Sequence, residues 1–297
     1  MKKCVIEEDI QQIEYLISKI ADDIKQIERM GGMTNHTYKV LTNKNKTYVV
    51  RIPGKGTEAM ICREDERVST ILACNLGIDS SLLYFGEDGS KITEYIEEAV
   101  TLDNERMKST DTICDIAAVL RTLHTCGEDT GIVFDVFEMA DTYSSIIEEH
   151  GIAMYSDYPS IKARVMQIKD LVDRQSEIQL VPCHNDPLCE NWVYGKDRLY
   201  LIDWEYAGMN DSMWDLADVS VEAGFNDEQD NCLLEKYLEH TPNKCERMRF
   251  IANKLYLDYL WTLWGKARVP FDGEAMEEYA LGRYNRLRGN LNKLSNW

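Results

Sequence analysis

HNDPLCENWVYGKDRLYLIDWEY, residues 184–206, is the stretch that decides the fold of this chain. It contains two short apolar or alternating runs, WVY and RLYLID, separated by Gly195-Lys196-Asp197. This pattern predicts two antiparallel strands joined by a tight turn. Three polar residues flank or end the hairpin: Asp186, Asn191 and Asp203. A single polar residue in a loop is more often a turn or cap residue than a ligand, but the order and spacing of these three predict one shared polar site.

The spacing within this stretch is similar to the catalytic loop of protein-kinase-like phosphotransferases. There, a His-x-Asp sequence is followed five residues later by Asn; the Asp contacts the substrate hydroxyl and the Asn holds a magnesium ion. A second Asp after a hairpin is where these enzymes keep their main metal-binding residue. We therefore predict that Asp186 lies at the substrate and that Asn191 and Asp203 bind Mg²⁺. His184 is expected to fix the loop backbone rather than to act as a base.

The composition limits the partners. The formal net charge of -19 over 297 residues argues against nucleic acid or an anionic membrane as the main partner, because both would be repelled. ATP would be repelled as well, so a nucleotide site would need magnesium and a local basic residue. The nine cysteines are scattered without zinc-site spacing. Together with the lack of a signal-peptide-like or membrane-spanning apolar run, this predicts reduced thiols in the cytoplasm.

The N-terminal third combines a helix with strands. Isoleucines and leucine at three- and four-residue intervals predict an amphipathic helix over 9–27, and period-two patterning predicts strands over 27–52. The glycine turn between the first two strands would let backbone amides approach a phosphate, although a plain hairpin turn is the default reading. No GxxxxGK[ST] sequence is present, which disfavours a P-loop enzyme. The candidate nucleotide-loop residues are Gly32, Thr34 and Asn35.

Further nucleotide contacts are expected from the following elements. Arg51 ends the run YVVRI and is the basic residue that would reach the α and β phosphates, although alone it would be read as a solvated strand end. Either Glu64 or Glu66, both in the helix predicted over 58–75, could face Arg51, and Glu66 is the preferred candidate of the two. The next hairpin ends at Glu94 and Ile96, where backbone groups are expected to meet the adenine edge.

After residue 97 the pattern becomes helical. Helices are predicted over 111–125, 136–149, 158–174, 227–240, 243–268 and 272–293, and no low-complexity linker separates them from the strands. This organisation predicts an α+β, two-lobed fold, with a small antiparallel-sheet lobe at 1–96 for nucleotide binding. The larger, mainly helical lobe at 97–297 would carry catalysis and substrate binding. His124 is expected to be a packed core residue.

Two tryptophans stand three residues apart in LYLDYLWTLWGKAR. Trp261 and Trp264 share one helix face, which is usually a core position. The sharper hypothesis is an aromatic wall, since indole faces attract quaternary ammonium groups without needing a hydrogen bond. An acid such as Glu222 would complete such a site.

In these motifs the chain resembles the choline/ethanolamine kinase family, which is grouped with the aminoglycoside phosphotransferases in the protein-kinase-like fold. The resemblance extends from about residue 28 to 285. It rests on GGMTNHTYKV, YVVRIPG, HNDPLCEN, IDWEYAGMN, WDLADVSVEAG, LWTLW and EEYALGRY. The compact length is similar to that of the bacterial lic-type members. Pro187 departs from the less rigid residues often found after the catalytic Asp in this family.

The resemblance implies roles for individual residues. Asp186 would be the catalytic base, Arg51 would stand where protein kinases carry Lys, and Asn191 and Asp203 would hold magnesium. The choline pocket would be lined by Tyr206, Glu222, Trp261, Trp264 and Tyr279.

The expected function is ATP-dependent phosphorylation of choline, with Mg²⁺ as cofactor. One alternative is a kinase of the same fold acting on ethanolamine, an aminoglycoside or another small hydroxyl compound. A second is a non-catalytic nucleotide-binding protein that retains the fold. The expected partner is choline or a related amino alcohol, with neither nucleic acid nor a stable membrane association.

Overall fold

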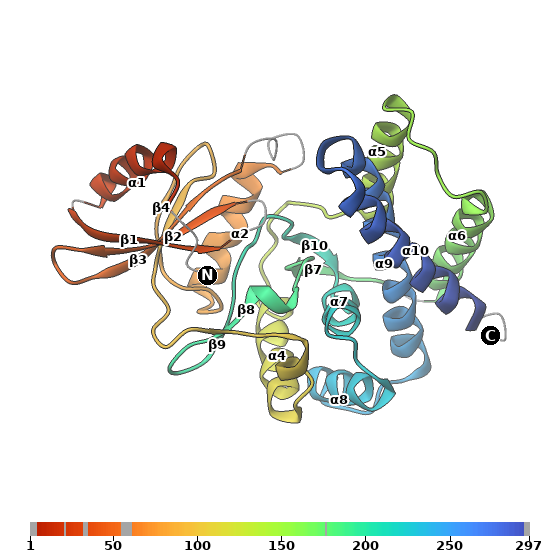
Figure 1. Ribbon diagram of the computed structural model, residues 1–297. Helices are drawn as coiled ribbons and strands as arrows, with labels where there is room; N and C mark the ends of the chain where they lie inside the picture. The colour runs from red at the N-terminus through yellow and green to blue at the C-terminus, as the bar shows by residue number, and fades with distance from the viewer. Residues whose placement is uncertain (1–4, 21, 32–34, 55–60, 176, 294–297) are drawn as a thin grey trace.

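A five-stranded antiparallel sheet forms the smaller part of the protein. The computed structural model describes residues 5–20, 22–31, 35–54, 61–175 and 177–293. The strand order is β1-β2-β3-β5-β4. Figure 1 shows this sheet at one end of the molecule and helices at the other. The strands are β1 (Ile24–Gly31), β2 (His36–Thr42), β3 (Thr47–Ile52), β4 (Leu82–Phe85) and β5 (Lys91–Glu94).

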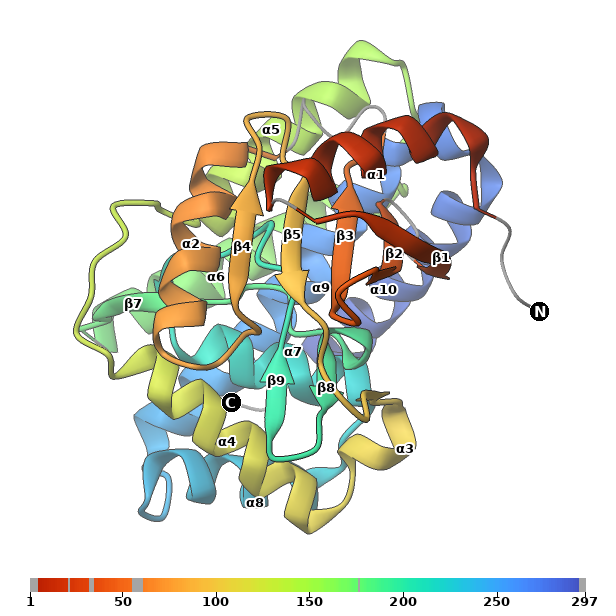
Figure 2. The ribbon, with the colours of Figure 1, turned by 90° about the vertical axis from the view of Figure 1, so that its left-hand side faces the viewer.

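The sheet has a helix against each of its faces. Alternate residues of β3 point to opposite sides, because side chains along a strand have a period of two. Val50 and its neighbours pack with α1 (Glu7–Lys19) in one apolar cluster. Arg51, on the other face, reaches Glu66 of α2 (Arg63–Asn75). Figure 2 shows α1 crossing in front of the strands.

The predicted N-terminal helix is present but shorter than expected. It ends at Lys19, and Ile24 and Ile27 lie in strand β1. The register of β1 against β2 shifts between Ile24 and Gln26. Such a bulge inserts one extra residue, so two isoleucines three positions apart both pack on the cluster below α1. The prediction of a helix to residue 27 was therefore wrong, because a bulged strand mimicked helical spacing.

Short strands connect the sheet to the helical part. The predicted hairpin is confirmed as β8 (Trp192–Tyr194) and β9 (Leu199–Leu201), which pair antiparallel. β6 (Val100–Thr101) adds to its edge. A second pair, β7 (Leu180–Cys183) with β10 (Gly208–Asp211), brackets the 184–206 stretch. The β7–β10 pair thus holds the two ends of the stretch together, and the middle of the stretch forms the β8–β9 hairpin.

The larger part is mainly helical, and α9 and α10 pack closely against each other along its far side. Its apolar cluster draws on nearly every helix from α4 onward and includes the fully buried Trp192, Trp204 and Trp214. None of the described helices is long and apolar enough to cross a lipid bilayer. A small antiparallel sheet joined to a mostly helical remainder confirms the predicted α+β class. The helices are α3 (Asn104–Met107), α4 (Thr110–His124), α5 (Val136–Glu149), α6 (Tyr158–Gln175), α7 (Met213–Ala223), α8 (Asp227–Leu238), α9 (Lys244–Asp272) and α10 (Glu274–Lys293).

Candidate active site

The backbone of the 184–206 stretch is held by one buried carboxylate. Asp215, in the first turn of α7, accepts hydrogen bonds from the N–H groups of His184 and Asn185, both at 2.8 Å. Asn185 has a left-handed backbone (φ 67°), which asparagine tolerates better than most residues. Its side chain donates to the carbonyls of Tyr206 and Gly208 at 2.9 and 3.3 Å. The loop conformation is therefore fixed by Asp215 on one side and by the bonds of the Asn185 side chain to the backbone of Tyr206 and Gly208 on the other.

His184 joins the two ends of the stretch. Its Nε2 lies 3.0 Å from the carbonyl oxygen of Ile202, and its Nδ1 lies 3.3 Å from the N–H of Asp186. Burial lowers the pKa of His184, which favours the neutral ring. A neutral ring with its proton on Nε2 donates to Ile202 and accepts from Asp186. This arrangement matches the expectation that His184 fixes the loop backbone.

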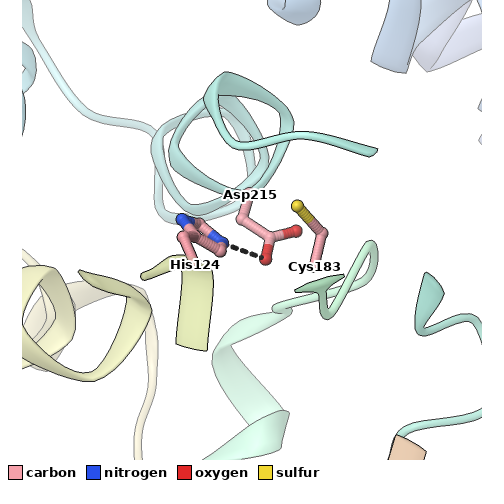
Figure 3. A group of neighbouring side chains, drawn as sticks. All are labelled: His124, Cys183 and Asp215. Atoms are coloured by element: carbon pink, nitrogen blue, oxygen red, sulfur yellow. Dashed lines mark hydrogen bonds and ion pairs between the residues drawn. The ribbon is translucent and has the colours of Figure 1, made fainter. Parts of the chain in front are cut away.

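A buried group of three side chains, His124, Cys183 and Asp215, lies next to the backbone of this loop. Figure 3 shows His124, Asp215 and Cys183 side by side, a combination that can in principle hold a metal ion. Here, however, His124 contacts Asp215 at 3.0 Å and Tyr237 at 2.9 Å through its two ring nitrogens. Burial raises the pKa of the Cys183 thiol well above its usual range, and Asp215 raises it further. The ligand atoms are thus committed to the protein, and we read the group as support for the loop.

The three predicted polar residues come together around the hairpin. Asn191 donates from its side chain to the carbonyl of Asp186 at 2.9 Å. Asp203 has a left-handed backbone (φ 72°), a conformation that a non-glycine residue adopts only when its surroundings impose it. Burial raises the pKa of Asp186 well above its usual range, and the charges of Asp203 and Glu222 raise it further, against the effect of Arg283.

Arg51 connects the sheet to this loop. Its guanidinium is 6% exposed and forms an ion pair with Glu66 of α2. The Nη1 atom also lies 3.0 Å from Asp203 and 3.1 Å from Glu205. Glu64, by contrast, is exposed and pairs with Arg67. The structure therefore places Glu66, and not Glu64, against Arg51, which decides between the two candidates that the sequence left open.

Glu205 is a centre of this network that the sequence reasoning missed. It contacts Arg63 at 2.7 Å and accepts a hydrogen bond from Asn35 at 3.1 Å. Burial raises the pKa of Glu205, as does Asp203, while Arg51 opposes the rise. One oxygen each of Glu66, Asp203 and Glu205 lies within 4.8 Å of the others. Carboxylate oxygens of this kind suit a hard divalent cation. Because Arg51, Arg63 and Lys91 already hold both oxygens of Glu66, Asp203 and Glu205 are the candidate ligands of this set.

The remaining predicted nucleotide residues are placed as follows. Gly32 and Thr34 lie outside the described residues. Glu94 ends β5 with an exposed side chain, and Ile96 follows it, half-buried. The Ile96 side chain lies so close to Gly195 that a Cβ there would approach it to 2.7 Å. The 94–96 segment thus runs along the turn of the β8–β9 hairpin.

Four aromatic rings form a continuous aromatic wall, defined here as Tyr206, Trp261, Trp264 and Tyr279. Tyr206 meets Trp261 with ring centroids 5.6 Å apart, and the two tryptophans are 5.9 Å apart. Trp264 meets Tyr279 at 5.6 Å. All three contacts are edge to face, the geometry that the ring quadrupoles favour. The predicted substrate residues are therefore brought together from three separate segments.

Gly265 allows α10 to approach α9 at this wall. A Cβ on Gly265 would lie 2.9 Å from the ring of Tyr279 and 3.0 Å from the Cβ of Ala280. Only a residue without a side chain fits such a close helix contact.

Acidic and basic side chains lie beside the aromatic wall. Glu222 and Asp218 are one turn apart on α7 and thus share a helix face. Glu222 contacts Nη1 of Arg283 on α10 at 2.5 Å. Both oxygens of Asp218 are buried without a hydrogen-bond partner among the described residues. Burial raises the pKa of Asp218 well above its usual range, and the charges of Glu222 and Asp186 raise it further.

The sequence held weak signals for the residues that were missed. Glu205 stands two positions after Asp203 in the opening stretch, Asp218 stands one turn before Glu222, and Arg283 stands one turn after Tyr279. Each is a helix or loop neighbour of a predicted residue, but no spacing rule showed which neighbours face the site.

Comparison with known proteins identifies the relatives of this chain. The sequence model of the choline/ethanolamine kinase family matches residues 24–265. The protein LicA of Haemophilus influenzae is 31% identical over 264 residues, covering 86% of this chain and 76% of LicA. Human ethanolamine kinase 2 is 25% identical over 263 residues, covering 80% of this chain and 68% of that enzyme.

Solved structures agree. A choline/ethanolamine kinase family protein from Mesorhizobium loti superposes with a TM-score of 0.85 at 30% identity, covering 96% of this chain and 94% of that one. The choline kinase LicA from Streptococcus pneumoniae gives 0.82 at 34% identity, with 95% and 98% covered. An aminoglycoside phosphotransferase, APH(2″)-IIa, gives 0.65 at 18% identity, with 95% and 97% covered, which supports the fold alone. The predicted two-lobed, kinase-like fold is confirmed.

Proposed function

The chain belongs to the choline/ethanolamine kinase family and is a phosphotransferase with an alcohol group as acceptor, and we propose that its acceptor is choline. The observation that carries this proposal is the aromatic wall beside the acids Glu222 and Asp186. A trimethylammonium group has no N–H to donate and is recognised by ring faces and nearby negative charge. An aminoglycoside would instead need many polar groups in place of indole rings.

We propose ATP as the phosphoryl donor, in line with the crystal structure of LicA in complex with AMP. Arg51 would contact the phosphates, with Glu66 orienting its guanidinium. The backbone at Glu94 and Ile96 would contact the adenine edge, and Asn35, together with Gly32 and Thr34 just before it in the sequence, would approach the phosphates.

The acidic residues fit a magnesium ion. Asp203 and Asn191 would hold it, and the nearness of Glu205 to Asp203 supports Glu205 as a further ligand. When bound, magnesium neutralises charge on the phosphates of ATP. The oxygen-rich donor set is the kind that Mg²⁺ prefers, and no thiolate or imidazole takes part.

The catalytic base in this proposal is Asp186. Its carboxylate would hold the substrate hydroxyl and accept its proton as the γ-phosphoryl group transfers directly to the oxygen. A raised pKa makes the carboxylate a better proton acceptor, and the fixed loop backbone holds it in place. His184 and Asp215 would act only by positioning this loop.

We also propose a functional division of the chain. Residues 1–96 would form the nucleotide-binding lobe, and residues 97–297 would carry catalysis and substrate binding. In support, the N–H of Tyr95 bonds to Thr47 of the large sheet, whereas the carbonyl of Glu97 accepts from Lys196 of the β8–β9 turn. The backbone thus bonds to the five-stranded sheet at Tyr95 and to the β8–β9 turn at Glu97, two residues later.

The test is ADP release by the purified protein with magnesium, ATP and a panel of choline, ethanolamine and aminoglycosides. Choline should give the highest kcat/KM. Trp261→Ala should raise the KM for choline more than the KM for ATP, since the aromatic wall contacts only the acceptor. A preference for ethanolamine, whose ammonium donates hydrogen bonds, would favour ethanolamine kinase activity over choline kinase activity. A KM for choline unchanged in Trp261→Ala would contradict the proposed role of the aromatic wall in binding choline.

A further inference from the structure

A cation of the protein itself already stands at the proposed acceptor pocket. The side chain of Arg283 is 6% exposed, and its guanidinium lies over the ring of Tyr279, 5.1 Å from the ring centroid. Its Nη1 contacts Glu222 at 2.5 Å. These are the two kinds of contact, an aromatic face and a carboxylate, that the pocket would offer to the ammonium group of an amino alcohol.

The pairing between Arg283 and Glu222 is electrostatic rather than a well-directed hydrogen bond. Neither Nη1 of Arg283 nor Oε1 of Glu222 has a hydrogen-bond partner of suitable geometry among the described residues. A guanidinium is most stable when its donors meet acceptors in plane. Only Nε of Arg283 achieves this, by donating to the hydroxyl of Tyr279 at 3.1 Å.

A second acceptor for this guanidinium is available. Asp218 is completely buried, neither of its oxygens accepts a hydrogen bond from the described part of the chain, and it stands one turn from Glu222 on α7. Asp258, another acid near Arg283, lies 3.6 Å away and already accepts three hydrogen bonds from Arg286, at 2.6 to 3.0 Å. Asp218 is therefore a buried acid close to Arg283 that can accept hydrogen bonds from its guanidinium.

We propose that Arg283 is a specificity-determining residue that occupies Glu222 in place of the substrate cation and shifts to Asp218 when that cation binds. This inference rests on the proposed function for the identity of the acceptor. A cationic acceptor can then pair with Glu222 while Arg283 pairs with Asp218, so that no buried arginine is left unpaired. An uncharged alcohol cannot take the place of the guanidinium at Glu222. Asp218 acts through Arg283 and is a positioning residue, not a catalytic one.

The test compares a cation with an uncharged molecule of the same shape. Binding of choline, of tetramethylammonium and of 3,3-dimethylbutan-1-ol, in which carbon replaces the nitrogen of choline, is measured by calorimetry on the full chain. In Asp218→Asn, affinity for both cations should fall by about tenfold, the effect of losing one charged hydrogen-bond partner. Affinity for the uncharged alcohol should stay within about twofold. Asp197→Asn, in the exposed β8–β9 turn, is the matched control and should bind all three like the wild type.

Equal losses for cations and alcohol, or no loss for either, would overturn the proposal, because a structural role of Asp218 does not depend on ligand charge. Asparagine has the shape of aspartate and removes a buried acid, so the variant is expected to fold. If it does not, a crystal structure of the wild type with tetramethylammonium decides: Arg283 should contact Asp218, and a guanidinium still on Glu222 contradicts the proposal. Tetramethylammonium binding requires no turnover, so a failure of choline phosphorylation is distinguished from a failure of this exchange.

Discussion

The Nη1 atom of Arg51 lies 3.0 Å from Oδ1 of Asp203, although 152 positions separate the two residues in the chain. This contact joins the sheet of the smaller part to the loop of the larger part. A similar contact, Arg283 with Glu222, lies at the aromatic wall. In both places an arginine balances an acid that we propose to bind a ligand.

Replacing Asp186 with Asn should lower kcat by about 10²- to 10⁴-fold, the range for loss of a general base. The amide keeps the shape of the carboxylate but cannot accept the hydroxyl proton. Nucleotide affinity, measured by calorimetry with a non-hydrolysable ATP analogue, should remain close to that of the wild type. Asp197→Asn, exposed in the hairpin turn, is the control with unchanged kcat. Near-normal turnover in Asp186→Asn would rule out its assignment as base.

Replacing Glu66 should lower stability and weaken ATP binding far more than replacing Glu64, although both residues lie on α2. Glu66→Gln removes a buried charge from Arg51, Arg63 and Lys91, which contact it in the structure. Breaking a buried ion pair from one side costs about 3 kcal/mol, so urea unfolding should show a large loss of stability, and the KM for ATP should rise. Glu64→Gln, whose partner is exposed, should unfold at nearly the wild-type urea concentration. Equal behaviour of the two variants would contradict the placement of Glu66.

Gly265→Ala should disturb the aromatic wall. The added methyl group would lie 2.9 Å from the Tyr279 ring, and overpacking of this kind costs about 1–3 kcal/mol. The thermal midpoint should fall and the KM for choline should rise, with the KM for ATP little changed. Gly282→Ala on α10 is the control, because its Cβ would meet nothing within 4 Å. If Gly265→Ala left both the midpoint and the KM unaltered, α9 and α10 would have to pack less closely than described.

Asp79 should make stability depend on pH. Burial raises the pKa of Asp79 from 3.8 to about 6, even though Lys91 nearby and hydrogen bonds from Ser80 and Trp204 favour the charged form. The folded state then binds a proton more tightly than the unfolded state, so this group's contribution to stability is fully present below about pH 4. It is lost as pH rises through about 6.

The size of this effect is at most about 3 kcal/mol, because the shift spans about two pH units. The difference in unfolding free energy between the wild type and Asp79→Asn, measured by urea titration from pH 4 to 7, should therefore move in favour of the variant as pH rises. Asp197→Asn serves again as the exposed control. A difference that stays constant with pH would show that Asp79 titrates normally.

The sequence by itself determined the hairpin and its three polar residues, because Asp186, Asn191 and Asp203 lie close together in the chain and local spacing constrains them. It also predicted the α4, α5 and α6 helices to within a residue of their observed ends, since strong apolar periodicity identifies a helix without tertiary information. Where a bulge in β1 imitated helical spacing, the same rule was misleading.

Only the tertiary structure decided which acids and bases face one another. Glu66 and Glu64 are equally acidic in sequence, but α2 turns one towards the buried Arg51 and the other to solvent. Nothing in the sequence marks Asp218 and Arg283 as site residues. They meet because α7 and α10 both pack against α9. Helix packing brings together residues that are far apart in the chain, and a local sequence pattern does not predict such long-range contacts.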